Sequence, residues 1–141
     1  MKVVIDNNVI IDALRPNPDF ESDAKRVFQL IWQGKISPYM CANSLTDVFY
    51  IMKKVQGAAR TKKTIADLMT AIAIAPLTES DCKDALALPM DDFEDAIIAV
   101  CAQKINADCI VSRDRKFINE GTLVEVITPG QMIERLIEKT V

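Results

Sequence analysis

The sequence predicts an α/β protein whose sheet is mainly parallel and covered by helices. Two observations support this fold class. Short apolar runs rich in β-branched residues recur along the 141 residues, and stretches with helical periodicity separate them. Strands that alternate with helices in this way pair in parallel and bury both faces of the sheet. The expected order of elements is β-α-α-β-α-α-β-α-α-β-α-β-α.

The first third of the chain is expected to form a strand, two helices and a second strand. Residues 2–5 form a buried strand, because Val-Val-Ile follows the initial lysine. A short helix over about 8–14 stops before the two prolines in the break at 15–18. The next helix starts at Ser-Asp and runs over 22–34, with apolar residues at i, i+3, i+4 spacing and a terminal glycine. Residues 36–40 form a weak strand.

The middle of the chain adds three helices and one strand. A helix is expected over 43–55, because Asn-Ser suits its N-terminus and its apolar residues share one face. Gly57 ends that pattern and a long helix follows from about residue 58. Residues 72–77 form a strand, and a threonine caps the helix over 79–88. The inward-facing residues of the long helix and its end are predicted to be Ile65, Leu68, Met69 and Ile72.

The last third is expected to contain a buried helix, two strands and a C-terminal helix. Asp92 caps a helix that runs to about residue 105. Strands follow over 109–112 and 123–127, with one helix between them. Thr128-Pro129 begins the last helix, with proline in its favoured first turn.

Size and composition favour a single domain over residues 1–141, because half of the residues are hydrophobic. The longest uninterrupted apolar run spans 96–102, whereas a membrane span needs roughly 18 residues or more. The N-terminus has no long apolar segment of the kind found in signal peptides. Cys41, Cys82, Cys101 and Cys109 contain no C-x-x-C pair, and we expect buried free thiols in a reducing cytoplasm.

The composition also excludes several kinds of chemistry. The chain has no histidine, so it lacks Ser-His-Asp and Cys-His catalysis and an H-E-x-x-H zinc site. The four glycines are too far apart for a phosphate-binding loop. Catalysis would therefore depend on carboxylates, hydroxyls, amides and cations.

The net charge of −3 does not indicate nucleic-acid binding by bulk charge. A local basic cluster nevertheless lies within eleven residues: Lys53, Lys54, Arg60, Lys62 and Lys63. It is either a solvated surface at the helix ends or a set of phosphate contacts.

Three aspartates stand at positions typical of a ligand site. Asp6 directly follows the first strand, Asp114 follows the strand over 109–112, and Asp95 lies in the first turn of an apolar helix. Ligands of parallel α/β sheets bind outside the carboxyl ends of the strands. Each residue has a simpler interpretation: Asp6 as a helix cap, Asp95 in a capping box with Asp92, and Asp114 in an exposed turn.

Three further aspartates are weaker candidates. Asp47 occupies either an exposed position on the 43–55 helix or a place in the site. Asp12 and Asp91 are expected on a helix surface and in a loop, respectively.

Taken together, the carboxylates indicate a cation site. Carboxylates that share a small site repel one another by about 4 kcal/mol per pair at about 4 Å, for an effective dielectric constant of about 20. They must then bind protons or capture a cation. Oxygen ligands without histidine or cysteine select Mg²⁺ or Mn²⁺. Such an ion would activate water for hydrolysis of a phosphodiester.

The sequence resembles the PIN-domain (PilT N-terminus) family, and in particular VapC-type toxins. The resemblance covers essentially the whole chain. Its motifs are V-V-I-D-N-N-V-I-I-D at 3–12, D-F-E-D-A-I-I-A at 92–99, I-V-S-R-D at 110–114 and T-P at 128–129. It implies a three-layer α/β/α sandwich and Mg²⁺- or Mn²⁺-dependent cleavage of single-stranded or loop RNA.

The resemblance also implies roles for individual residues. The family's acids map to Asp6, Asp95 and Asp114 as metal ligands and catalytic residues, with Asp92 as a further ligand. Asn8 and Ser112 map to polar positions that support the site. The family commonly has a glutamate on the third helix, where this chain offers the shorter Asp47. VapC-type members imply two protein partners, a small antitoxin and a second copy of the chain in a homodimer.

Three functions remain open at this point. The first is a metal-dependent endoribonuclease that is the toxin of a toxin–antitoxin pair. The second is a degenerate PIN module that binds RNA or protein without cleaving. The third is a receiver-like or phosphatase-like protein with Asp6 as phosphoacceptor, which the sequence disfavours because Asn8 stands where a phosphatase would have aspartate.

Overall fold

The computed structural model describes residues 1–15, 17–120 and 123–140, and the strands and helices follow the predicted order. The strands are β1 (Lys2–Ile5), β2 (Ser37–Cys41), β3 (Ala73–Ala75), β4 (Cys109–Val111) and β5 (Val126–Ile127). The helices are α1 (Asn7–Leu14), α2 (Glu21–Trp32), α3 (Ala42–Gln56), α4 (Ala58–Ala71), α5 (Glu79–Leu86), α6 (Phe93–Lys104), α7 (Arg115–Glu120) and α8 (Pro129–Thr140).

The strands form one sheet in the order β3-β2-β1-β4-β5, and every neighbouring pair is parallel. β1 is central: its Val3 pairs with Pro38 of β2 on one side and with Cys109 of β4 on the other. The chain builds outward from β1 to β3 and then continues on the opposite side with β4. The carboxyl ends of β1 and β4 therefore border the switch point, where α/β sheets bind their ligands.

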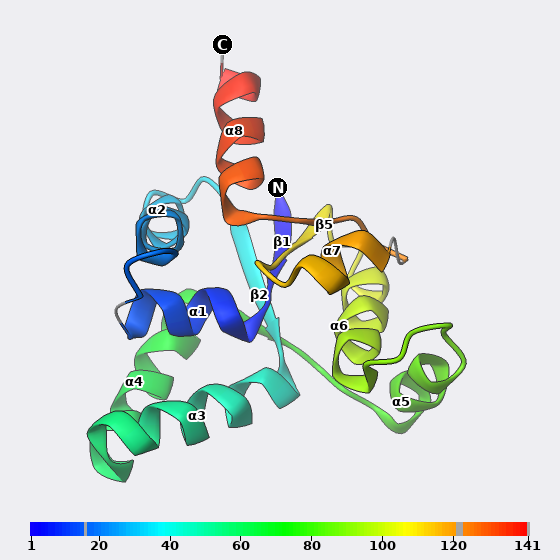
Figure 1. Ribbon diagram of the computed structural model, residues 1–141, viewed down its shortest axis with the longest axis horizontal. Helices are drawn as coiled ribbons and strands as arrows, with labels where there is room; N and C mark the ends of the chain where they lie inside the picture. The colour runs from blue at the N-terminus through cyan, green and yellow to red at the C-terminus, as the bar shows by residue number, and fades with distance from the viewer. Residues whose placement is uncertain (16, 121–122, 141) are drawn as a thin grey trace.

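Helices cover both faces of the sheet, so the fold is the predicted three-layer α/β/α sandwich (Figure 1). Val3 and Ile5 of β1 pack in the layer formed by α1, α2, α3, α4 and α8. Val4 points the other way, into the layer that contains α5, α6 and α7. This alternation explains why the strand is apolar throughout: both of its faces are buried.

α6 is buried along most of its length. Every residue from Asp95 to Ala102 is buried, because the helix packs on β1, β4 and α5. A helix that is enclosed on most sides shows no polar stripe, which accounts for the uniformly apolar sequence of this segment.

Some boundaries and one core position differ from the prediction. β3 and β5 are shorter than the expected 72–77 and 123–127. Met69, predicted to face inward, is 52% exposed. The reason is that α4 packs on α3 and β3, which suffices to bury Leu68 but leaves the neighbouring side chain outside.

The four cysteines are free; Cys41, Cys101 and Cys109 are buried and Cys82 is partly buried. In the part of the chain that the structure describes, no helix has both the length and the apolar character that crossing a bilayer requires.

Candidate functional site

Asp6 lies where β1 ends and α1 begins, at the carboxyl edge of the sheet. As the N-cap of α1, its Oδ1 accepts a hydrogen bond from the backbone N–H of Asn7 at 2.8 Å. Its Oδ2 accepts from Ser112 Oγ at 2.8 Å and from Asn8 Nδ2 at 3.3 Å. Asp6 is buried, so these donors compensate part of its lost hydration. The cap role and a ligand role are compatible, because a carboxylate has about four acceptor positions.

Ser112, directly after β4, forms hydrogen bonds with residues at the start of α1. Its buried Oγ donates to Asp6 and accepts from Asn8 Nδ2 at 3.2 Å and from the Asp114 N–H at 3.1 Å. Asn8 Oδ1 in turn accepts from the Arg113 N–H at 3.3 Å. The two residues predicted to support the site therefore hold the Asp6 carboxylate and the segment after β4 in one hydrogen-bonded network.

Asp95 and Asp92 occupy the first turn of α6. Asp92 is the N-cap, and its Oδ1 accepts from the Asp95 N–H at 3.1 Å. The described residues show only this half of the capping box, whereas Thr78 and Asp81 of α5 make both halves. The carboxylate of Asp95 is thus not engaged in capping. It remains available at a buried position.

A second pair of carboxylates meets at Asn7. Asn7 Nδ2 donates to Asp47 Oδ2 at 3.1 Å and to Glu94 Oε1 at 3.2 Å. Asp47 of α3 is therefore half-buried at the site and not fully exposed. Glu94 is not among the site residues predicted from the sequence. Its position beside Asp95 in the first turn of a buried helix was a signal that could have identified it.

Asp114 is an exposed residue at the start of α7. Its Oδ1 accepts from the Lys116 N–H at 3.0 Å, so it makes the predicted local turn. Its negative charge nevertheless interacts with the other acids and contributes to the raised pKa of both Asp6 and Asp95.

The pKa values show that these carboxylates share one electrostatic environment. Burial is the main cause that raises the pKa of Asp95 to about 7, followed by the charges of Asp92, Asp6 and Asp114. Burial also raises the pKa of Glu94 to about 7, with Asp47 as the next cause. Burial raises the pKa of Asp6, while donation from Ser112 opposes that rise. Four separate segments of the chain contribute these acids.

The donor set fits a hard divalent ion, but the acids do not form a closed cage. Within residues 1–15, 17–120 and 123–140, no three acidic or cysteine side chains are already arranged around a common metal position. All available ligands are oxygens, which suits Mg²⁺ or Mn²⁺. Mg²⁺ commonly keeps several waters, so an open carboxylate cluster with raised pKa values is compatible with such an ion.

Asp12, expected on a helix surface, is instead buried. The guanidinium of Arg113 neutralises it, with Nε to Oδ2 at 2.6 Å and a second contact to Oδ1 at 3.3 Å. A buried carboxylate needs such a partner. The prediction for Asp12 was wrong because the partner lies 101 residues away in sequence. Asp91 is exposed, as expected for a loop, and lies 3.6 Å from Lys116.

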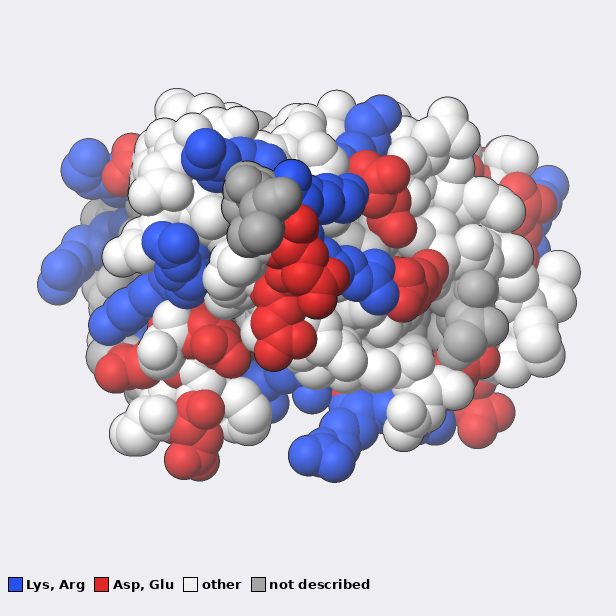
Figure 2. All heavy atoms as spheres, turned by 90° about the horizontal axis from the view of Figure 1, so that it is seen from above, with Lys and Arg blue, Asp and Glu red and all other residues white. Residues whose placement is uncertain are grey.

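The basic cluster lies at the end of α3 and the start of α4. Its five side chains are exposed, and Lys63 forms an ion pair with Asp67 of α4 at 3.7 Å. Lysines in the last turn of α3 also complement its helix dipole. On the face shown in Figure 2, basic and acidic side chains are interspersed. The Lys63–Asp67 ion pair and the lysines at the end of α3 fit a solvated surface, and the alternative of phosphate contacts stays a prediction.

A family model described as a PIN domain matches residues 2–116. Three solved structures illustrate the similarity of fold. VapC20 from Mycobacterium tuberculosis, described as a toxin that cleaves the sarcin–ricin loop, is 16% identical with a TM-score of 0.67, covering 85% of this chain and 95% of that one. A toxin–antitoxin complex from Klebsiella pneumoniae is 19% identical with a TM-score of 0.67, covering 90% and 97%.

The third structure is VapBC2 from Rickettsia felis bound to a DNA fragment from their promoter. It is 13% identical with a TM-score of 0.66, covering 91% of this chain and 98% of that one. At these identities the likeness establishes the fold. The search of curated proteins found no match.

Proposed function

The chain belongs to the PIN-domain family, and on this premise we propose that it is a divalent-metal-dependent endoribonuclease, the toxin of a toxin–antitoxin pair. The observation that carries the proposal is the convergence of acids from four segments at the carboxyl ends of β1 and β4. Asp6 follows β1 and Asp114 follows β4. Asp47 lies in α3 and Asp95 lies in α6. A structural role alone does not require so many neighbouring carboxylates, because their repulsion destabilises the fold.

Asp6, Asp95 and Asp114 would hold the ion, with Asp92 as a further ligand. When bound, Mg²⁺ or Mn²⁺ would lower the pKa of a water that attacks the phosphodiester and neutralise charge on the leaving oxygen. The remaining residues position these acids. Ser112 and Asn8 fix the orientation of the Asp6 carboxylate through their hydrogen bonds to Oδ2.

Asp47 and Glu94 would act in proton transfer at the edge of the site. Asn7 holds both carboxylates through a single amide group. With a pKa of about 7, Glu94 exchanges a proton readily at neutral pH. Such a group is suited to accept a proton at Oε1 or to donate one, and in this role it would complement the shorter Asp47.

The test is cleavage of a mixed tRNA and rRNA pool with and without a chelator. We expect Asp6→Asn and Asp95→Asn to abolish cleavage while the far-ultraviolet circular dichroism spectrum stays unchanged. The matched control is Asp84→Asn, which alters an exposed aspartate of α5. Full activity in both site variants would end the assignment.

A non-cleaving RNA- or protein-binding module is the second candidate. The aspartate at position 47, where the resemblance leads one to expect a longer glutamate, favours it. Titration with Mn²⁺ separates the two proposals, because an ion that binds the folded state stabilises it by mass action. An unchanged melting temperature at millimolar Mn²⁺ would support the non-cleaving module.

The partners would be RNA, a small antitoxin and a second copy of this chain, in the cytoplasm, where the free thiols stay reduced. The solved structures of similar fold include toxin–antitoxin complexes. The toxin role predicts that expression of active protein arrests growth and that coexpression of the neighbouring small gene product relieves the arrest. Sedimentation of the purified protein would test the homodimer.

A further inference from the structure

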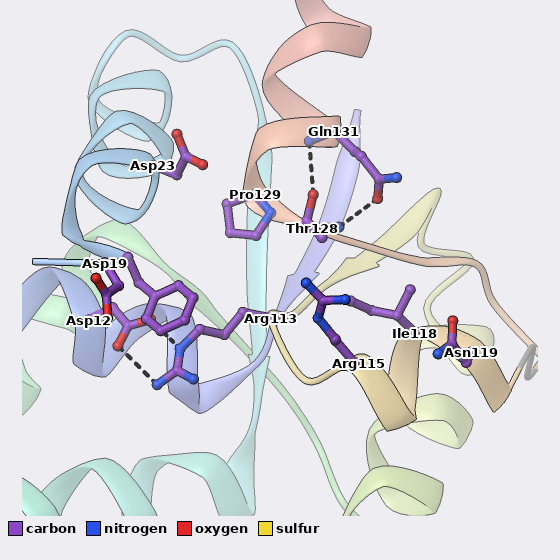
Figure 3. Close-up of a pocket in the computed structure, with 11 residues that line it drawn as sticks. Asp12, Asp19, Asp23, Arg113, Arg115, Ile118, Asn119, Thr128, Pro129 and Gln131 are labelled. Carbon is purple, nitrogen blue, oxygen red and sulfur yellow. Dashed lines mark hydrogen bonds and ion pairs between the residues drawn. The ribbon is translucent and has the colours of Figure 1, made fainter. Parts of the chain in front are cut away.

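A pocket of about 460 Å³ is lined by Arg113 and Arg115, the residues on either side of Asp114. Figure 3 shows it between α1, α2, α7 and the start of α8, with Arg113 and Arg115 extending along its edge. Pockets that bind small organic groups typically have volumes of about 300–1,000 Å³. The cavity is therefore large enough for a nucleobase with its sugar.

The segment that follows β4 connects the pocket with the proposed catalytic centre. Consecutive side chains after β4 go to different sides: Ser112 bonds Asp6 of the centre, whereas Arg113 reaches Asp12 in the pocket. The two side chains belong to adjacent residues, so this short segment contributes to both places. A strand of RNA whose phosphate lies at the acids would place a neighbouring nucleotide at the mouth of the pocket.

The pocket contains a fixed planar surface. Asp12 holds the Arg113 guanidinium by two contacts, and the guanidinium carbon lies 4.1 Å from the centre of the Phe20 ring. Asp12 is 3% exposed, while Phe20 is 40% exposed. Unpaired RNA bases stack on aromatic rings and on arginine planes of this kind. The exposed part of Phe20 would provide the surface on which a base stacks.

The rim of the pocket offers hydrogen-bond groups of a defined type. Asp19 and Asp23 are exposed lining residues, and within the described residues their carboxylates make no hydrogen bond or ion pair. The same holds for the guanidinium of Arg115. Carboxylates accept hydrogen bonds from exocyclic amino groups of bases, and a free guanidinium suits a phosphate.

We propose that this pocket, formed by Arg113 on Phe20 with Asp19, Asp23 and Arg115 at its rim, binds an unstacked base of the RNA next to the scissile phosphate. The inference rests on the proposed ribonuclease function and adds a source of sequence preference to it. Adenine, guanine and cytosine each carry an exocyclic amino group, and Asp19 or Asp23 would accept a hydrogen bond from it. Uracil has none, and its ring N–H lies between two carbonyl oxygens that a carboxylate repels.

Binding without cleavage tests the pocket separately from catalysis. Fluorescein-labelled pentanucleotides of adenine, cytosine or uracil are titrated with protein in EDTA, and anisotropy reports the affinity. We expect the adenine and cytosine oligomers to bind on the order of tenfold more tightly than the uracil oligomer. Asp19→Ala/Asp23→Ala should abolish this difference.

The matched control is Glu79→Ala/Asp84→Ala, which removes two exposed acids from α5 and changes the net charge equally; it should retain the difference. Cleavage of a randomised single-stranded library, with sequencing of the cut ends, then locates the preferred position. Cleavage without base discrimination would overturn the pocket but not the ribonuclease. Base discrimination without cleavage would overturn the proposed ribonuclease function but not the base-binding pocket. If Asp19→Ala/Asp23→Ala keeps the preference for adenine and cytosine over uracil, the assignment of the pocket to an RNA base is also overturned. A protein partner would then be the candidate occupant of the pocket.

Discussion

Replacement of Asp95 by asparagine should stabilise the metal-free protein at neutral pH. Burial and neighbouring acids raise the pKa of Asp95 from 3.8 to about 7. Between these values the folded state binds more protons than the unfolded state, so the free energy of unfolding falls as the pH rises. At about 1.4 kcal/mol per pKa unit, the expected loss by pH 7 is at most about 4 kcal/mol, and solvent screening makes the measured loss smaller.

The window between pH 5 and 7 suits this measurement, because the chain has no histidine to titrate there. Asp6 and Glu94 also have raised pKa values, so the variant should keep part of the slope. The assay is urea denaturation in EDTA at several pH values. We expect stability of the wild-type protein to fall from pH 5 to 7 and Asp95→Asn to flatten that fall.

The control is Asp84→Asn, which removes an exposed charge from α5 and should leave the slope unchanged. The reasoning would be refuted by a wild-type stability that is constant or rises from pH 5 to 7. An Asp95→Asn variant that is no more stable than wild type at pH 7.5 would refute it equally.

Three other variants test the remaining contacts. Arg113→Ala leaves buried Asp12 unpaired and should cost about 3 kcal/mol in urea denaturation; if Asp12→Asn/Arg113→Ala recovers nothing, the ion pair is not the cause. Ser112→Ala removes the donor to Asp6 and should lower cleavage by about 10- to 100-fold with the fold intact; unchanged activity would contradict the role of this network. Asn7→Ala removes the donor that Asp47 and Glu94 share and should raise the apparent pKa in the pH–rate profile; an unchanged profile would show that neither acid takes part.

The fold could be predicted from sequence because its signals are local. Val3, Val4 and Ile5 mark a strand that is buried on both faces, and helix caps and prolines divide the rest of the chain. The prediction was weakest where packing decides the outcome. Met69 satisfies the helical spacing of a core residue, yet α4 packs on α3 and β3 in a way that leaves this side chain exposed.

The positions of the candidate site residues could be predicted where a residue's place in a strand or helix sets its position. Asp6 and Asp95 could be located because one ends a strand and the other opens a buried helix. The ion pair of Asp12 with Arg113 and the bond from Asn7 to Glu94 join segments 101 and 87 residues apart. Such partners depend on tertiary structure, which a single sequence does not specify at the level of side chains.

The most direct test of the central claim is a crystal structure of the protein grown with Mn²⁺. We expect an anomalous difference peak within bonding distance of the carboxylates of Asp6 and Asp95, with Asp114 facing the same ion. The absence of a peak at these residues at saturating Mn²⁺, or a peak at another surface only, would contradict the claim that the acids converge to bind a catalytic metal.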